Sequence, residues 1–152
     1  MAERKVVLLM DNFSAHEAAS EGVGSHLQNT LIIWLTSNST TRYQPLDQGI
    51  IRTWKAYWKQ QWILYMMAEF GRGFNPISTM TVLQALRWAI PAWNIDLKSD
   101  TIQCCFKRAL SIEDAEEMKD QELLNELQQG LQKLQLSNNI QEAMDINQFL
   151  NP

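Results

Sequence analysis

Two short apolar runs, with 19 residues between them, constrain the fold of this chain more than any other feature. Val6–Met10 is apolar throughout and begins with two β-branched residues, and Thr30–Leu35 is a second run of the same kind. Residues 14–28 read as a loop and a helix, loosened by Gly22 and Gly24. We therefore expect a strand–helix–strand unit, with parallel strands buried on both faces and a right-handed crossover.

The rest of the chain has helical periodicity. The longest helix is predicted from Asp47 or Gln48 through Phe70, and others over about Ser78–Trp93, Ser99–Leu110 and Ile140–Leu150. Ser99 is expected to cap its helix. The longest helix carries an aromatic stripe at three- and four-residue spacing: Ile51, Trp54, Trp58, Trp62 and Tyr65. This spacing favours packing of the stripe on the sheet over stacking on nucleotide bases.

Charge divides the chain into two parts. Residues 1–111 hold 11 Lys and Arg against 8 Asp and Glu, whereas residues 112–152 hold 2 against 9. The first part is mildly basic, which permits nucleic-acid binding if the charge is clustered. The acidic tail carries a leucine ladder of Leu124, Leu127, Leu131 and Leu134, shorter than two heptads. We expect a helical tail that is solvated, binds a partner or pairs with another helix in an oligomer.

Several classes of protein are excluded by simple features. No run of 18 apolar residues is present, so no membrane-spanning helix is expected. The charged N-terminus lacks the pattern of a signal peptide. Cys104 and Cys105 are the only cysteines. Because they are adjacent, they predict neither an unstrained disulfide nor a zinc site, and a reducing cytosol or nucleus is the default.

Two carboxylates stand where chemistry collects in parallel-sheet proteins. Asp11 ends the first apolar run, and Asp47 follows the second run and its polar loop. Function gathers at the carboxyl ends of parallel strands. Two acids held together there repel each other unless a cation lies between them, and paired Mg²⁺ ions suit phosphodiester chemistry. Spacing alone leaves an ordinary alternative open, in which Asp47 caps the helix that follows it.

Two longer motifs resemble those of a known family. "LLMDNFSAH" at residues 8–16 and "YQPLDQGIIRTWKAYW" at residues 43–58 closely resemble DDE-superfamily transposases of the pogo/Tigger type, which include relatives of centromere protein B. "AWNIDLKSDTIQCCFKRA" at residues 92–109 resembles the closing helices of that family. The resemblance covers roughly residues 5–111. It implies an α/β, RNase H-like fold for residues 1–111, with residues 112–152 as an appended α-helical tail.

The resemblance also implies a metal site. Family members hold two Mg²⁺ or Mn²⁺ ions with three carboxylates, of which Asp11 would be the second and Asp47 the third. The same motifs contain Asn12, His16, Gln44 and Pro45. His16 either hydrogen-bonds near the rim of the site or is a solvated histidine at a helix start. The first acid and the DNA-binding domains of the family have no counterpart here, which predicts the C-terminal part of a catalytic domain.

The implied reaction is metal-dependent cleavage and strand transfer of DNA in the nucleus. For this chain alone we expect nucleic-acid affinity at most, weak metal binding and no efficient catalysis. Contacts to DNA phosphates are expected from Arg42, Arg52, Lys55 and Lys59, unless these form only a solvated basic face. Two alternatives stay open. Another polypeptide or segment could supply the first acid to an active enzyme, or the chain could be a non-catalytic interaction protein that uses its helices and leucine-rich tail.

Overall fold

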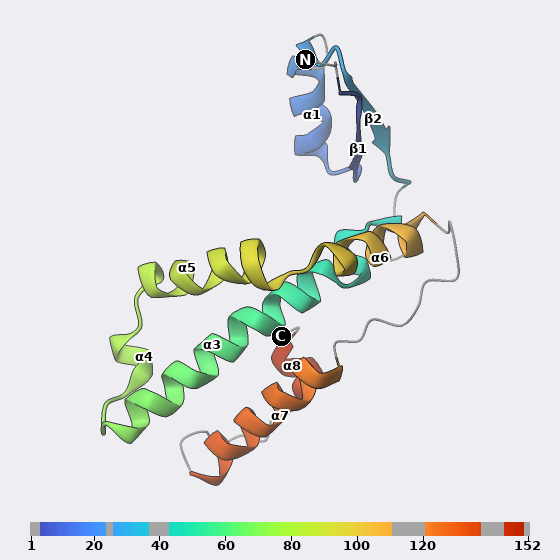
Figure 1. The fold of residues 1–152 in the computed structure, drawn as a ribbon. Coiled ribbons are helices and arrows are strands. Elements are labelled where there is room, and N and C mark those ends of the chain that lie inside the picture. Colours follow the sequence, from blue (N-terminus) through green and yellow to red (C-terminus); the bar gives the residue numbers. More distant parts are fainter. Residues whose placement is uncertain (1–3, 24–25, 37–42, 111–120, 138–144, 151–152) are drawn as a thin grey trace.

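The computed structural model describes residues 4–23, 26–36, 43–110, 121–137 and 145–150. At one end of the molecule, β1 (Val6–Met10) and β2 (Thr30–Trp34) form a two-stranded parallel sheet. The helix α1 (Ser14–Val23) connects them, so the predicted strand–helix–strand unit is confirmed. Figure 1 shows this unit in blue, standing apart from the helices that follow.

The expectation that both faces of the strands are buried is wrong. Val7 is 57% exposed and Leu31 is 60% exposed, and α1 contributes no buried residue. Two strands and one short helix have too little surface to cover two sheet faces, because sheets need further strands or helices against them. Within the described part of the chain, nothing else covers these strands.

The rest of the described chain is helical, which makes the protein mixed α/β with helices dominant. The elements are η2 (Leu46–Ile50), α3 (Ile51–Gly71), α4 (Pro76–Thr79), α5 (Val82–Pro91), η3 (Ala92–Asp96), α6 (Ser99–Ala109), α7 (Gln121–Leu136) and α8 (Ile146–Leu150). Two of them, η2 and η3, are single π-helical turns. The long predicted helix is confirmed as η2 followed by α3. For the last predicted helix, residues 140–144 lie outside the described residues, Asp145 is not helical, and α8 covers Ile146–Leu150.

Two predicted helix boundaries differ from the structure. The single helix expected over residues 78–93 is divided into α4 and α5, because Met80 and Thr81 are extended and the Thr81 hydroxyl accepts a hydrogen bond from the Gln84 amide (3.2 Å). Ser99 is not an N-cap. It is the first helical residue of α6, and Lys98 precedes it as a cap without a side-chain hydrogen bond.

The largest core lies between α3 and the two C-terminal helices. Buried side chains of α3 pack against the inner face of α7 and the end of α8, and Figure 1 shows these three helices next to one another. The cluster consists of Ala56, Ile63, Met66, Leu123, Leu127, Leu131, Leu134, Phe149 and Leu150. The expectation of a solvated tail is therefore wrong for α7, since its leucine ladder is used inside the chain. Residues 112–120 lie outside the described part, and the predicted domain boundary stays a prediction.

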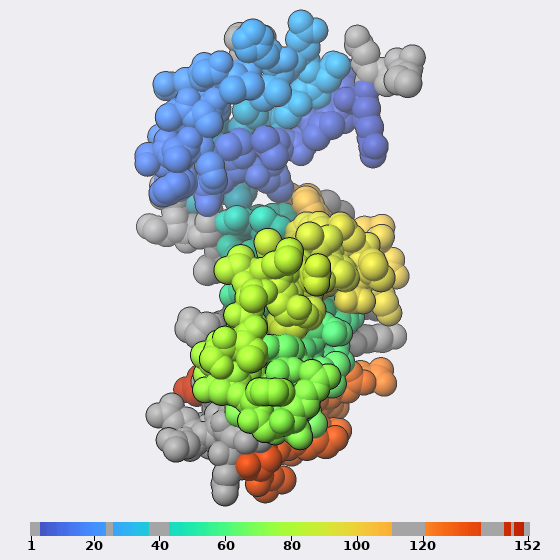
Figure 2. All heavy atoms as spheres, turned by 90° about the vertical axis from the view of Figure 1, so that its left-hand side faces the viewer, coloured from blue at the N-terminus to red at the C-terminus, as the bar shows by residue number. Residues whose placement is uncertain are grey.

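The aromatic stripe of α3 packs, as expected, but its partners are helices and not the sheet. The indole N–H of Trp54 donates to the Ala89 carbonyl (3.0 Å), and that of Trp58 to the Ala85 carbonyl (2.9 Å), both on α5. Figure 2 shows α4 and α5 on the face of the molecule toward the viewer. Trp62 instead meets Phe149 of α8, with 5.6 Å between ring centroids. Among the described helices, none is long and apolar enough to span a membrane.

Candidate functional site

Asp11 lies at the carboxyl end of β1, where the chain turns into α1. The last strand residue, Met10, still pairs with β2, because its carbonyl accepts the amide of Leu35 (2.7 Å). The next residue is free of the ladder, and its carboxylate turns to the start of α1. His16 Nδ1 lies 2.6 Å from Asp11 Oδ1, and the amide of Phe13 donates to the same oxygen (3.4 Å). Both alternatives for His16 describe part of the structure, because it makes this hydrogen bond while its side chain is 46% exposed in the first turn of α1.

Asp47 lies in a tight turn that opens the long helix. The Asp47 amide donates to the Gln44 carbonyl (3.0 Å), and the Gln48 amide to the Pro45 carbonyl (3.2 Å). Gly49 has φ 141°, a conformation that side chains of L-residues disfavour. Asp47 itself is exposed in the first turn of η2. The residues that precede η2 and α3 make no side-chain capping bond, and neither of them is Asp47.

The turn that carries Asp47 is held by α6, a contact between distant segments that sequence reasoning missed. Ile50 of the turn is buried with Leu97 and Cys105. Arg108 Nη1 donates to the Gln48 carbonyl (3.4 Å). The three-, four- and seven-residue spacing of Ile102, Cys105 and Ala109 marks this inner face of α6 in the sequence. That pattern identifies an apolar face but not its partner.

The predicted phosphate contacts do not form one group in the structure. Arg42 lies outside the described residues. Arg52 is exposed in the first turn of α3, and Lys55 is half-buried one turn later. Lys59 faces the tail, with Nζ 4.3 Å from the ring centroid of Phe149. Burial, and then the charge of Lys55, lower the pKa of Lys59 below the ordinary 10.5.

Two further motif residues, Asn12 and Gln44, lie close to the acids along the chain. Asn12 is exposed directly after Asp11. Gln44 is half-buried and acts through its backbone carbonyl, which closes the turn that carries Asp47.

The described residues do not by themselves form a complete metal site. Within them, no three His, Cys, Asp or Glu side chains lie together in a way that could hold an ion. Asp11 directly follows β1 and Asp47 lies in η2, and Figure 1 shows the strand unit standing apart from the helices. The donor type does fit a hard divalent cation, because such ions take carboxylate oxygens. Asp11 and Asp47 are therefore of a suitable donor type, and Asp11 is held by hydrogen bonds from His16 and Phe13.

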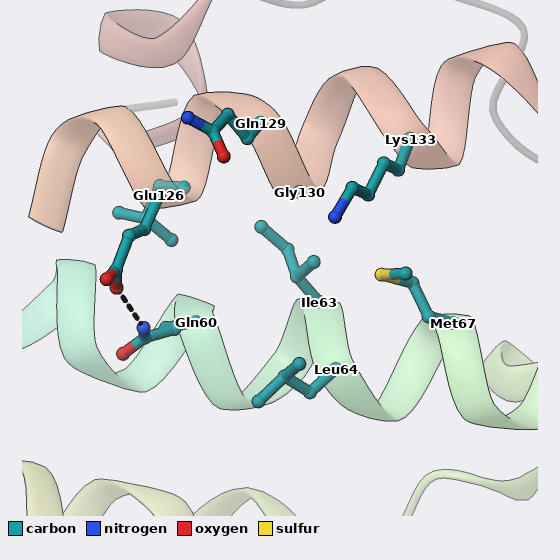
Figure 3. A pocket seen from close by; sticks show the side chains of 9 residues that line it. Gln60, Ile63, Leu64, Met67, Glu126, Gln129, Gly130 and Lys133 are labelled. Carbon is teal, nitrogen blue, oxygen red and sulfur yellow. Dashed lines mark hydrogen bonds between the residues drawn. The ribbon is translucent and has the colours of Figure 1, made fainter.

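A groove of about 250 Å³ lies elsewhere, between α3 and α7. Figure 3 shows Ile63, Leu64 and Met67 of α3 below it, with α7 above. Gln60 Nε2 donates to Glu126 Oε2 across one end (2.8 Å). Neither Asp11 nor Asp47 lines this groove, so it is separate from the acid-bearing turns.

Comparison with known proteins defines the class of this chain. Residues 1–106 match the model of the DDE superfamily endonucleases, and the chain belongs to that family. It is 42% identical over 112 residues to CENP-B homolog protein 2 of Schizosaccharomyces pombe, covering 72% of this chain and 22% of the relative. It is 32% identical over 157 residues to ARS-binding protein 1 of the same organism, covering 100% of this chain and 30% of the relative.

A third relative, CENP-B homolog protein 1 of S. pombe, is 29% identical over 112 residues, covering 72% of this chain and 22% of the relative. The chain thus spans less than a third of the length of these curated relatives. No solved structure matches it. The resemblance seen in the sequence motifs is confirmed.

Proposed function

We propose that this chain is the C-terminal part of a transposon-derived DDE catalytic domain with an RNase H-like fold, and that it binds DNA in the nucleus. The proposal is carried by one observation. Within the segment that belongs to the endonuclease family, the carboxylate of Asp11 stands at the carboxyl end of a parallel strand and is held there by its neighbours. That is where parallel-sheet proteins keep their reacting groups.

Asp11 and Asp47 are, in this proposal, two of three carboxylates of a metal site. DDE superfamily endonucleases generally depend on a divalent metal, and the ion supplies charge stabilisation for phosphodiester cleavage. A pair of ions needs a further ligand group, and the described residues offer no set of three. We therefore expect weak binding of Mg²⁺ or Mn²⁺ and no efficient cleavage by this chain alone.

The proposed DNA contact is the region around the turn that carries Asp47. Arg52 is exposed five residues after Asp47. Arg108 of α6 donates a hydrogen bond to the carbonyl of Gln48, the residue that follows Asp47. Cations beside a carboxylate site hold phosphates close to it. The names of the relatives agree with a DNA partner, since one is called ARS-binding protein 1.

Binding of duplex DNA over a range of salt concentrations tests the DNA contact. Arg52→Gln should weaken binding and reduce the slope of log affinity against log salt by about 1, because one phosphate contact is lost. Arg87→Gln, an exposed arginine on α5, is the matched control and should leave the slope unchanged. Equal slopes for both variants would remove Arg52 from the interface.

A nicking assay with Mn²⁺ tests the first alternative, an enzyme that is active when another segment supplies the missing acid. We expect little or no nicking by this chain. If nicking is observed, Asp11→Asn and Asp47→Asn should each abolish it, while Glu21→Gln on α1 should not. Nicking that survives both aspartate substitutions would come from a contaminant. The second alternative, a non-catalytic interaction protein that uses its helices and leucine-rich tail, loses support for the tail because the leucines of α7 pack on α3.

A further inference from the structure

The carboxylate of Asp11, whose side chain is 26% exposed, has one oxygen that is held by two groups. Both bonds from described residues, the one from His16 Nδ1 at 2.6 Å and the one from the Phe13 amide at 3.4 Å, go to Oδ1. An aspartate that only shaped the turn would need the bond to the Phe13 amide and nothing more. The short contact with His16 calls for a separate explanation.

His16 is itself held in place by the first turn of α1. Its backbone amide donates to the Phe13 carbonyl (2.8 Å), and the Glu17 amide shares that acceptor (3.3 Å). The rings of Phe13 and His16 make an edge-to-face contact, with 5.6 Å between centroids and an interplanar angle of 77°. Backbone and ring contacts therefore limit the rotation of the imidazole, although the side chain is 46% exposed.

The pairing determines which ring nitrogen carries the proton. A carboxylate only accepts hydrogen bonds, so Nδ1 must be the donor and the neutral ring must have its proton there. Free histidine shows no such constraint. The geometry also leaves the second oxygen of Asp11, Oδ2, without a bond to His16 or Phe13.

We propose that His16 is a positioning residue, which donates Nδ1–H to Oδ1 of Asp11 and holds the carboxylate so that Oδ2 is left for an outside ligand, a divalent cation. The proposal rests on the proposed function of Asp11. His16 acts through Asp11 and need not touch the ion. Removing a partner that orients a metal-binding side chain in this way typically lowers the metal affinity by about 10- to 100-fold.

The tautomer of His16 is the first measurement. In a ¹⁵N-labelled chain at about pH 8, where an ordinary histidine is neutral, the ring nitrogen shifts should show Nδ1 protonated and Nε2 bare. Asp11→Ala should return the ring to the mixture of tautomers found in a free histidine. A proton on Nε2 in the unaltered chain, or a tautomer that Asp11→Ala does not change, would overturn the proposal.

Substitutions of His16 by two amides separate positioning from a general structural effect. In His16→Asn the amide N–H₂ can take the place of Nδ1, whereas in His16→Gln the same group lies one methylene further out. Coupling constants that report the side-chain rotamer of Asp11 should stay near those of the unaltered chain in His16→Asn. They should average over rotamers in His16→Gln and His16→Ala. Rotamer populations that are the same in all four proteins would overturn the proposal.

Binding of Mn²⁺ alone, measured by line broadening of the Asp11 signals, gives the functional readout. His16→Ala should weaken binding by about 10-fold, and His16→Asn should restore most of the loss. If the unaltered chain binds no Mn²⁺ at Asp11, the proposed function fails, while tautomer and rotamer still test the pairing separately. If Mn²⁺ binds and His16→Ala changes nothing, the positioning role fails and the proposed function stands.

Discussion

Gly49 connects the sequence motif around Asp47 to the path of the backbone. Its φ of 141° lies in a region that glycine adopts readily and other residues rarely adopt. The turn bends at this residue, between Asp47 and the long helix. An Ala at this position has to keep a strained conformation or distort the turn. Gly49→Ala should therefore lower the free energy of unfolding by about 1–3 kcal/mol, as measured by urea denaturation.

The control for this prediction is Gly71→Ala at the end of α3. A Cβ added at Gly71 meets nothing within 4 Å, and this glycine has no positive φ. The substitution should be neutral or slightly stabilising, because alanine favours helix. Equal effects of the two substitutions would mean that the turn tolerates a side chain at Gly49.

Lys59 predicts a dependence of stability on pH that belongs to a single residue. Burial against the tail, and then the charge of Lys55, lower its pKa below 10.5. Between the lowered pKa and 10.5 the unfolded chain binds more protons than the folded chain at this residue. The contribution of Lys59 to stability therefore rises as the pH rises through that window.

Lys55→Gln tests this account of Lys59. Removing the neighbouring charge should raise the pKa of Lys59 only part of the way to 10.5, because desolvation is the larger cause. A ¹³C NMR titration of the Lys59 side chain measures the shift, with Lys98→Gln, at the exposed residue before α6, as the control. A pKa of Lys59 at or above 10.5 in the unaltered chain would contradict the burial of its ammonium group.

At the scale of the element, the contact between α3 and α7 depends on a glycine. A Cβ built on Gly130 would lie 2.8 Å from Cγ2 of Ile63, a buried β-branched side chain that cannot easily move. Gly130→Ala should destabilise the protein by about 1–3 kcal/mol despite its better helix propensity, because overpacking outweighs that gain. In an Ile63→Ala background, the same substitution should become stabilising by up to about 1 kcal/mol.

The sign change between the two backgrounds is the decisive result, and thermal or urea unfolding of the four proteins measures it. Gly22→Ala on α1, where a Cβ meets nothing within 4 Å, is the control for propensity alone. If Gly130→Ala stabilises both backgrounds equally, α7 does not approach α3 as closely as the structure has it.

The elements themselves could be predicted from the sequence, while their partners could not. Continuous apolar runs located β1 and β2 to within a residue, and helical periodicity located α3 to within a turn, since apolar patterning reports which segments have a face to bury. It does not report what covers that face. The indole groups of Trp54 and Trp58 point to α5, the leucines of α7 fill a core with α3, and Val7 and Leu31 are exposed.

The candidate site divides in the same way. Asp11, His16 and Asp47 could be found because they stand in two motifs of recognisable order. Arg108 could not, because it reaches the Gln48 carbonyl across 60 positions of sequence. Long-range contacts of this kind depend on how helices pack, which a single sequence does not state.

At the scale of the whole molecule, the structure uses the acidic tail as part of the fold. Leu127 is 1% exposed against α3, whereas Leu136 near the end of the same helix is 85% exposed. Leu127→Ala should cost about 2–5 kcal/mol of unfolding free energy and Leu136→Ala close to none. Sedimentation velocity should show that the unaltered chain does not form oligomers through its tail. It should also show that Leu127→Ala makes the chain less compact.

The opposite outcome has a clear form. If Leu127→Ala leaves the unfolding transition in place but dissociates an oligomer of the unaltered chain, α7 packs on another copy and not on α3. The tail would then be the partner-binding segment that the sequence allowed.

The central claim is that Asp11 and Asp47 serve one metal site, and paramagnetic broadening by Mn²⁺ tests it most directly. In an assigned ¹⁵N spectrum, Mn²⁺ should broaden the amides of residues 11–13 and 46–48 together, and Asp47→Asn should reduce the broadening of both sets. Glu21→Gln should change neither. Broadening of one set alone, or of both sets unaltered by Asp47→Asn, would contradict a shared site.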